Sequence, residues 1–212
     1  IERIEIDSGI SFDLRPQDLS IEQWINIGKL CININSWNNK LMSDLKNKKI
    51  IINAPAKINL HLEIIGKRED GFHELAMVMQ SINLSDQLEI EINNNGKLNL
   101  KTDSVNLEND DQNLIIKAAK LIKCYSGKKK LGANIFLRKK IPIGAGLAGG
   151  SSDAAATLIG LNKLWNLNLN WKILHQLASE LGSDVPFCIE GGSQYCFGRG
   201  EILKKYKFIN PY

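Results

Sequence analysis

Cysteine, proline and long apolar runs are all scarce in this 212-residue sequence. The four cysteines, Cys31, Cys124, Cys188 and Cys196, show no Cys-x-x-Cys spacing, so neither a structural zinc site nor a disulfide framework is predicted. No apolar stretch approaches the roughly 20 residues that cross a bilayer, and no signal-peptide pattern is present. These absences favour a cytoplasmic protein with reduced thiols and no membrane partner.

Charge of neither sign dominates, because 27 lysines and arginines face 23 aspartates and glutamates, for a formal net charge of +4. Such a mild excess suits a nucleotide or a phosphorylated small molecule and does not require nucleic acid as a partner. The hydrophobic content of 43% is ordinary for a globular protein, and the length is enough for one sizeable core. The oligomeric state is left open.

Glycine, in contrast, is concentrated in one stretch, with four glycines in seven residues. This stretch follows a β-type run at 133–137 and precedes a helical run at 154–165. Missing side chains let a ligand approach the backbone, and the free N–H groups of a helix N-terminus attract phosphate. Ser151, Ser152 and Asp153 are the N-cap candidates. The stretch reads Pro142-Ile143-Gly144-Ala145-Gly146-Leu147-Ala148-Gly149-Gly150-Ser151-Ser152-Asp153.

Three interpretations of the glycine stretch compete. A P-loop requires a lysine after the last glycine, where Ser151 stands. A dinucleotide-binding fingerprint is formally present at Gly144, Gly146 and Gly149, but its acidic partner is absent from 168–171. A glycine-rich turn before a helix needs no ligand at all. The stretch alone therefore leaves phosphate binding and a plain turn as equal alternatives.

The remaining pattern mixes strands and helices without regular βαβ alternation, so the expected fold class is α+β. Strands are predicted at 50–54, 60–65 and 88–92. Pro55 is expected to limit the ladder of the first of these strands. A turn at 93–96 then predicts a hairpin, with the returning strand over 97–101.

Helices are predicted at 114–125, where residues 110–113 supply the cap, and at 170–181. The apolar runs at 187–189 and 193–197 are expected to form a terminal hairpin. The basic run 138–140 is interpreted as a solvated surface, and attraction of a triphosphate is the alternative.

Four motifs in order, spread over about residues 50–203, resemble the GHMP kinase superfamily. The glycine stretch from Pro142 to Ser152 resembles its ATP-binding loop. The resemblance is to the branch that uses ATP to phosphorylate the 2-hydroxyl of cytidine diphosphate-linked methylerythritol in non-mevalonate isoprenoid (terpenoid) biosynthesis. The other motifs are Ala54-Pro55-Ala56-Lys57-Ile58-Asn59-Leu60, Asp70-Gly71-Phe72-His73-Glu74-Leu75 and Leu181-Gly182-Ser183-Asp184-Val185-Pro186-Phe187.

This resemblance implies a fold and a domain layout. Residues 42–212 are expected to form the N-terminal, ATP-binding GHMP kinase domain, a ribosomal-protein-like two-layer arrangement of sheet and helices. The family has a second α+β domain after this one, which is expected to be missing. Because the chain opens on Ile1 and stops at Tyr212 just after a predicted strand, we interpret it as a fragment of a larger enzyme.

The resemblance also implies residue roles. Asp184 is implied as the base for the acceptor hydroxyl, with Lys57 as the cation beside it. Phe72 is expected to stack on the cytidine base, His73 to hydrogen-bond to its edge, and Asn59 to complete the substrate side. ATP is implied along the loop, with Mg2+ bridging phosphate oxygens and no dedicated protein metal site. The implied ATP contacts are Pro142, Gly144, Ala145, Gly146, Leu147, Ala148, Gly149, Gly150, Ser151, Ser152 and, on the adenine side, Asn113.

Each role has a plainer interpretation. Taken alone, Asp184 is a turn residue before a proline, Lys57 is a surface lysine and His73 is a structural histidine. Two other functions also stay open. One is another GHMP kinase acting on homoserine or mevalonate, which would share the loop without needing Phe72 and His73. The other is a nucleotide-binding remnant without catalysis.

The segment 1–41 looks foreign to this domain. Residues 14–24 predict a turn and then a helix capped by Ser20, and they resemble the C-terminal tail of the small-subunit rRNA adenine dimethyltransferases. The methyl-donor site of those enzymes is absent, so no methyltransferase activity is implied. An ordinary N-terminal helix is the alternative. Met42 then stands where the kinase domain would begin.

Overall fold

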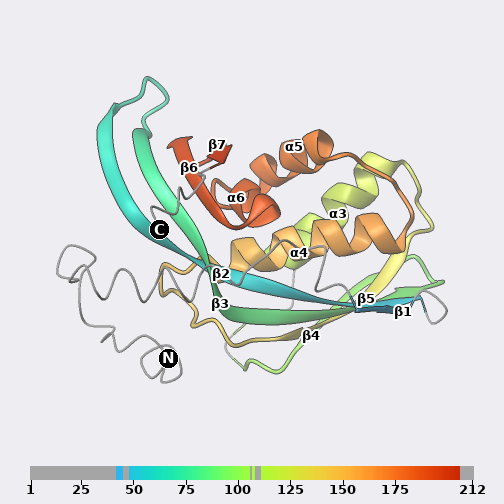
Figure 1. Cartoon of the computed structure of the whole chain (residues 1–212). Helices are drawn as coiled ribbons and strands as arrows, with labels where there is room; N and C mark the ends of the chain where they lie inside the picture. The colour runs from blue at the N-terminus through green and yellow to red at the C-terminus, as the bar shows by residue number, and fades with distance from the viewer. Residues whose placement is uncertain (1–41, 45–47, 106, 108–110, 206–212) are drawn as a thin grey trace, which may run out of the picture.

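The computed structural model describes residues 42–44, 48–105, 107 and 111–205. Within them a sheet forms one layer and helices cover one of its faces (Figure 1). This arrangement confirms the predicted two-layer α+β class. The segment 1–41, with its predicted helix and its resemblance to a methyltransferase tail, lies outside the described residues. The helices are α3 (Leu114–Ser126), α4 (Gly149–Leu164), α5 (Trp171–Leu181) and α6 (Val185–Glu190).

Two long antiparallel strands, β2 (Lys49–Lys67) and β3 (His73–Asn93), pair from end to end and organise the sheet. Their joined end bends up past the helices (Figure 1), and β1 (Met42–Asp44) pairs with the free edge of β2. The prediction that Pro55 limits the first strand is wrong. Pro55 lies opposite Ser85 inside the ladder, and the register shifts directly after it. A register shift accommodates a residue that has no N–H to donate.

Strand β3 has two partners on its other edge. Its C-terminal half pairs with β5 (Gly132–Arg138), and its N-terminal half pairs with β6 (Ser193–Gly198). Because β5 occupies the edge that a returning hairpin strand would need, β4 (Leu98–Thr102) pairs with β5 in parallel. The predicted strand at 97–101 therefore exists, but its predicted partner is wrong.

Helices α3 and α5 confirm both predicted helices. Asn113 lies within the predicted cap of α3, and Asn170, the predicted first residue of the second helix, is the N-cap of α5. The Asn113 side chain accepts a hydrogen bond from the Ile115 N–H at 2.9 Å, and the Asn170 side chain accepts one from the Ile173 N–H at 3.0 Å. Each cap satisfies an amide that has no acceptor within the helix. Gly127 ends α3 in the left-handed conformation, with a φ of 66°.

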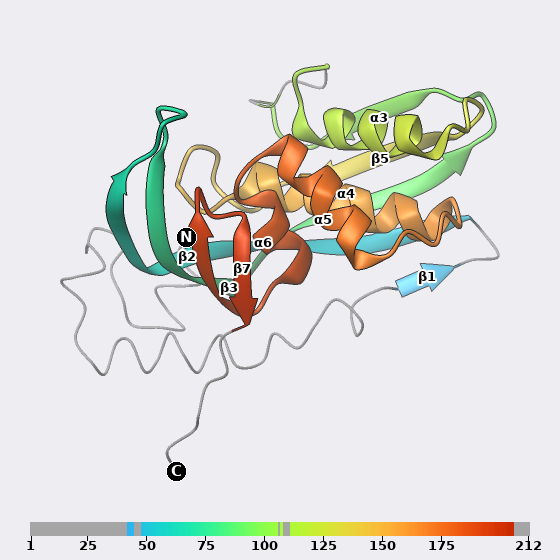
Figure 2. The same ribbon diagram turned by 90° about the horizontal axis from the view of Figure 1, so that it is seen from above.

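Helix α4 is the centre of the core. It contacts β2 and β3 on one side and α3, α5 and α6 on the others, with α5 above it in Figure 1 and in front of it in Figure 2. It begins at Gly149, earlier than predicted, and its N-cap is Ala148 in the left-handed conformation. The three predicted cap residues therefore lie inside the helix. Gly160 allows the close packing on the sheet, because a Cβ there would lie 2.7 Å from Ile90 Cδ1.

The predicted terminal hairpin is wrong in its first half. Residues 187–189 belong to helix α6, and β6 pairs instead with β7 (Ile202–Lys205). A short apolar run does not distinguish a buried strand from a buried helix, and Pro186 in the first turn is compatible with the helix. Among the described helices, none is long and apolar enough to cross a membrane.

Candidate active site

The glycine stretch folds as a loop that leads from β5 into α4. Gly144 and Gly146 have φ values of 76° and 73°, a conformation that other residues rarely adopt. The Ser152 N–H donates to the Ala148 carbonyl at 2.9 Å, which starts the ladder of helix bonds. The amides of Gly149, Gly150 and Ser151 precede that bond and have no acceptor within the helix. A row of such amides suits an anion.

The loop lines a cavity of about 870 Å³, whose other walls come from β2, the start of α3 and the residue before α6. Asn113 belongs to this cavity as well as capping α3. The structure thus brings most of the predicted site together, from segments far apart in the chain. The predicted residues that line it are Lys57, Asn59, Asn113, Pro142, Gly144, Ala145, Gly146, Leu147, Ala148, Gly149, Gly150, Ser151 and Asp184.

Ser152 does not line this cavity. Its side chain is buried, and its hydroxyl donates to the Pro55 carbonyl at 2.7 Å. Close by, the Lys57 N–H donates to the Leu147 carbonyl at 3.0 Å. The register shift in β2 between Pro55 and Lys57 therefore directs the Pro55 carbonyl to α4 and the Lys57 N–H to the loop. In this structure the Ser152 hydroxyl anchors α4 to β2, and its contact with phosphate stays a prediction.

Lys57 and Asp184 form an ion pair at the cavity wall, with Lys57 Nζ 3.5 Å from Asp184 Oδ2. Lys57 Nζ also donates to Asn59 Oδ1 at 3.3 Å. The Lys57 side chain is only 7% exposed, so the interpretation as a surface lysine is wrong. Asp184 stands at the N-cap position of α6, but its side chain makes no capping hydrogen bond. Its carboxylate, 30% exposed, is therefore available to a ligand in the cavity.

A buried cluster of three charges lies beneath the loop. Lys139 Nζ donates to Asp86 and, at 3.0 Å, to Asp153. The carboxylate of Asp86 also accepts the N–H groups of Lys140 and Ile141, whereas Oδ1 of Asp153 has no hydrogen-bond partner. The predicted solvated surface at 138–140 is thus wrong for Lys139, which contributes to this cluster and lines the cavity.

The cluster has more acid than base, and this sets its protonation. Burial, followed by the negative charge of Asp86, raises the pKa of Asp153 to about 8. Burial acts to lower the pKa of Lys139, but the charges and hydrogen bonds of Asp153 and Asp86 outweigh it and raise that pKa. Near neutral pH Asp153 therefore carries a proton.

Gly149 packs against this cluster. A Cβ at Gly149 would lie 2.8 Å from Lys139 Nζ and 3.1 Å from Ile141 Cγ2. Ion pairs on two sides hold the Lys139 ammonium in place, so it cannot move away freely. The missing side chain at Gly149 thus allows the start of α4 to pack directly on the cluster. Gly144 and Gly146 differ from Gly149, because a Cβ at either position would meet nothing within 4 Å.

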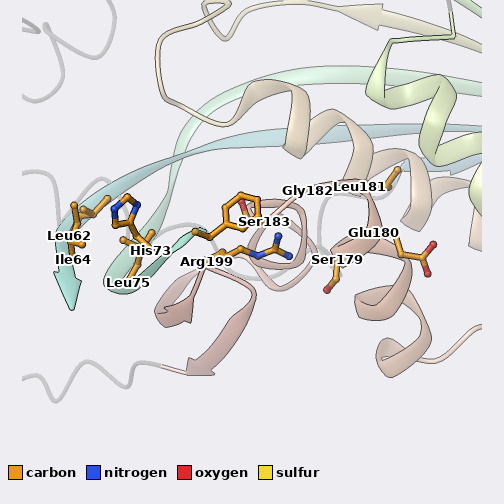
Figure 3. Close-up of a pocket in the computed structure, with 11 residues that line it drawn as sticks. Leu62, Ile64, His73, Leu75, Ser179, Glu180, Leu181, Gly182, Ser183 and Arg199 are labelled. Atoms are coloured by element: carbon orange, nitrogen blue, oxygen red, sulfur yellow. The ribbon is translucent and has the colours of Figure 1, made fainter. Parts of the chain in front are cut away.

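A second cavity, of about 420 Å³, holds the other two predicted site residues, Phe72 and His73. Figure 3 shows it between the curved end of β2 and β3, which carries Leu62 and His73, and the connection from α5 to α6. Ser183 lines this second cavity and Asp184 lines the first, so the two cavities meet at adjacent residues. The structure therefore separates the predicted ATP residues from the predicted base-binding residues.

The sequence offers uneven signals for the groups that our prediction missed. Arg199 lines the second cavity and stands between Gly198 and Gly200, a pattern typical of a tight turn that exposes one side chain. Asp86 offers no such signal, because its partner Lys139 is 53 residues away along the chain.

Known proteins resemble this chain in sequence and in structure. Residues 113–192 match the family described as GHMP kinases N terminal domain. A 4-diphosphocytidyl-2-C-methyl-D-erythritol kinase of Prochlorococcus marinus subsp. pastoris is 66% identical over 165 residues, which cover 78% of this chain and 53% of the relative. A crystal structure of 4-(cytidine 5'-diphospho)-2C-methyl-D-erythritol kinase superposes with a TM-score of 0.63 at 38% identity, covering 74% of this chain and 55% of that one.

The matched part of the chain has the fold of a GHMP kinase N-terminal domain. The matched family segment runs from the cap of α3 through the glycine loop to the residues that follow α6. It therefore contains the loop, Lys139 and Asp184, while Lys57 and Phe72 lie upstream of it.

Two further facts define the reach of this likeness. The chain spans about half the length of the curated relatives it matches. A homoserine kinase from Cytophaga hutchinsonii superposes with a TM-score of 0.55 at 21% identity, covering 73% of this chain and 49% of that one. At that identity the likeness concerns the GHMP kinase fold alone and does not distinguish one acceptor from another.

Proposed function

We propose that this chain is the ATP-binding, catalytic half of a kinase that phosphorylates the 2-hydroxyl of 4-diphosphocytidyl-2-C-methyl-D-erythritol in non-mevalonate isoprenoid biosynthesis. The observation that carries the proposal is the Lys57–Asp184 pair, which faces the glycine loop across one cavity. The 66% identity to a kinase of that name supports the choice of substrate.

The first cavity fits ATP. Its loop presents unpaired amides at a helix N-terminus, where the helix dipole also favours phosphate. A volume of about 870 Å³ is ample for a nucleotide. The described residues contain no cluster of three metal-binding side chains. Mg2+ would therefore be held mainly by phosphate oxygens and water, as is common for this ion, and would neutralise phosphate charge.

The ion pair can carry out the transfer. Asp184 accepts the proton of the acceptor hydroxyl as the hydroxyl oxygen bonds to the γ-phosphorus and the bond to the β,γ-bridging oxygen breaks, which releases ADP. Lys57 holds the carboxylate in place and stabilises the negative charge that develops on the transferred group. Asn59 accepts a hydrogen bond from the Lys57 ammonium, orients it and completes the wall of the first cavity.

The second cavity fits the nucleoside end of the acceptor. Phe72 is 54% exposed and offers a ring on which a base can stack, and the adjacent His73 can hydrogen-bond to the base edge. Because Ser183 and Asp184 join the two cavities, an acceptor bound by its base at one end can present a hydroxyl to Asp184 at the other.

Turnover with competing acceptors tests the proposal. The chain is joined to the C-terminal half of the Prochlorococcus relative, because it spans about half the length of that kinase. ATP consumption is then measured with the cytidine-linked methylerythritol, with methylerythritol phosphate, with homoserine and with mevalonate. We expect turnover with the first acceptor alone. Turnover with homoserine or mevalonate would favour the other GHMP kinases, and nucleotide binding without any turnover would favour a non-catalytic remnant.

The absence of nucleic-acid and membrane partners, and the cytoplasmic location, stay predictions from composition.

A further inference from the structure

Arg199 projects into the second cavity from the tight turn between β6 and β7. Figure 3 shows it between the strand residues Leu62 and His73 on one side and the connection from α5 to α6 on the other. Its guanidinium carbon lies 4.9 Å from the centre of the Phe72 ring. The guanidinium is thus stacked against the side chain that we expect to bind the base.

The turn that carries Arg199 is held by its backbone. The Arg199 N–H donates to Glu201 Oε2 at 2.7 Å, and the Gly198 N–H donates to Glu74 Oε1 at 3.1 Å. Gly200 has a φ of 116°, and a Cβ there would lie 3.1 Å from Met77 Cε, 3.3 Å from Met79 Cε and 3.6 Å from the Ser183 carbonyl oxygen. The turn is therefore seated directly beside the residue that precedes Asp184.

Neighbouring acidic groups leave the guanidinium of Arg199 available. Arg68 pairs with both Asp70 and Glu74, at 3.1 Å and 2.8 Å. Asp70 Oδ1 also accepts a hydrogen bond from the Phe72 N–H. Among the described residues, Arg199 forms no ion pair of its own. Asp70 lies near enough for its charge to interact with that of Arg199, but its oxygens accept from Arg68 and the Phe72 N–H. A planar guanidinium that is pre-positioned by stacking and not engaged in an ion pair suits a phosphate group, which it can bind with two parallel hydrogen bonds.

We propose that Arg199 determines specificity for a nucleoside diphosphate-linked acceptor by binding its diphosphate. This proposal rests on the proposed function of the same site. The guanidinium lies over the Phe72 ring, and Phe72 is 54% exposed, so the ring still offers surface on which the base stacks. The diphosphate then lies at Arg199, between the base and Ser183, and the alcohol beyond it reaches Asp184. The order of groups in the acceptor thus matches the order of residues along the cavities.

Calorimetric titration of the 212-residue chain with cytidine and with CDP tests this assignment. The parent chain is expected to bind CDP more tightly than cytidine. Arg199→Ala is expected to weaken CDP binding about 10- to 100-fold, the scale of a charge-assisted hydrogen-bond pair, and to leave cytidine binding unchanged. Arg199→Lys keeps the charge but loses the paired geometry, and is expected to recover only part of the CDP affinity.

Arg138→Ala is the matched control, because Arg138 also stacks on a phenylalanine, Phe136, at 5.2 Å but lies outside both cavities. It is expected to bind both ligands as the parent does. Unchanged CDP affinity in Arg199→Ala would overturn the role of Arg199 and leave the proposed function standing. Equal loss of cytidine and CDP binding would also overturn it, since it would mean that Arg199 only supports the pocket. A parent chain that binds neither ligand would count against the Arg199 site, while the acceptor assay judges the proposed function separately.

Discussion

At the scale of single residues, the chemistry depends on side chains whose surroundings determine their roles. Lys57 is a long cation held almost fully inside the protein, between Asn59 and Asp184. Burying a charge is costly unless it is paired, so the pair is retained where both partners serve a common purpose. We therefore propose Asp184, whose carboxylate neither caps its helix nor is fully enclosed, as the proton acceptor.

Asp184→Asn tests this directly. The amide keeps the size and most of the hydrogen bonding but cannot accept a proton, so turnover is expected to fall about 10²-fold or more. ATP affinity is expected to stay the same. Lys57→Met should also lower turnover, and the double variant should be little worse than the poorer single one, because the two residues act as a unit. Steady-state kinetics of the joined chain described above measure this, and near-parental turnover of Asp184→Asn would reject the base assignment.

At the scale of elements, the start of α4 depends on the charge cluster beneath it. Gly149→Val places side-chain atoms against Lys139 and Ile141, where a Cβ alone is already too close. We expect a loss of about 1–3 kcal/mol in the free energy of unfolding, typical of overpacking, and weaker ATP binding because the loop amides shift. Urea denaturation and calorimetry measure the two effects. Gly66→Val is the control, because a Cβ there meets nothing within 4 Å; equal behaviour of the two variants would contradict the packing argument.

The same cluster predicts a pH dependence. The pKa of Asp153 is raised to about 8 in the folded state, from an ordinary value of 3.8. Between these values the folded chain holds a proton that the unfolded chain has lost, so Asp153 lowers stability progressively as pH rises from about 4 to about 8. Asp153→Asn imitates the protonated acid and removes this dependence.

The measurement is the difference in free energy of unfolding between Asp153→Asn and the parent across pH 5–8. It is expected to shift in favour of the variant as pH rises, by at most ~1.4 kcal/mol per pH unit, the limit for one proton. A difference that stays constant over this range would show that Asp153 is ionised throughout. Comparing the variant with its parent cancels the titration of all other groups that the substitution leaves unchanged.

At the scale of the whole molecule, one sheet and one central helix collect residues from four separated motifs. The cavity-lining residues lie between Lys57 and Arg199. A chain that starts at Met42 keeps strand β1 and every one of these residues. We therefore expect removal of 1–41 to leave ATP affinity and melting temperature close to those of the 212-residue chain. Calorimetry and thermal unfolding test this, and a large fall in melting temperature would show that the leading segment stabilises the domain.

Sequence alone was enough for the local features. The amphipathic helices α3 and α5, and the Asn113 cap of α3, follow from periodicity and short-range hydrogen bonding, which need no information about distant residues. The candidate site was predicted from the resemblance of four short motifs to the GHMP kinase superfamily, which depends only on neighbouring residues within each motif.

Tertiary structure decided what depends on distant partners. Strand β4 pairs with β5 because β5 takes the edge of β3, and no local pattern encodes that competition. The run at 187–189 became helical in its packed surroundings, although its short apolar pattern suits either state. From the sequence, Lys139 is predicted to be solvated. In the folded chain it pairs with Asp86 and Asp153, because only folding brings charges that are far apart in the chain into one buried cluster.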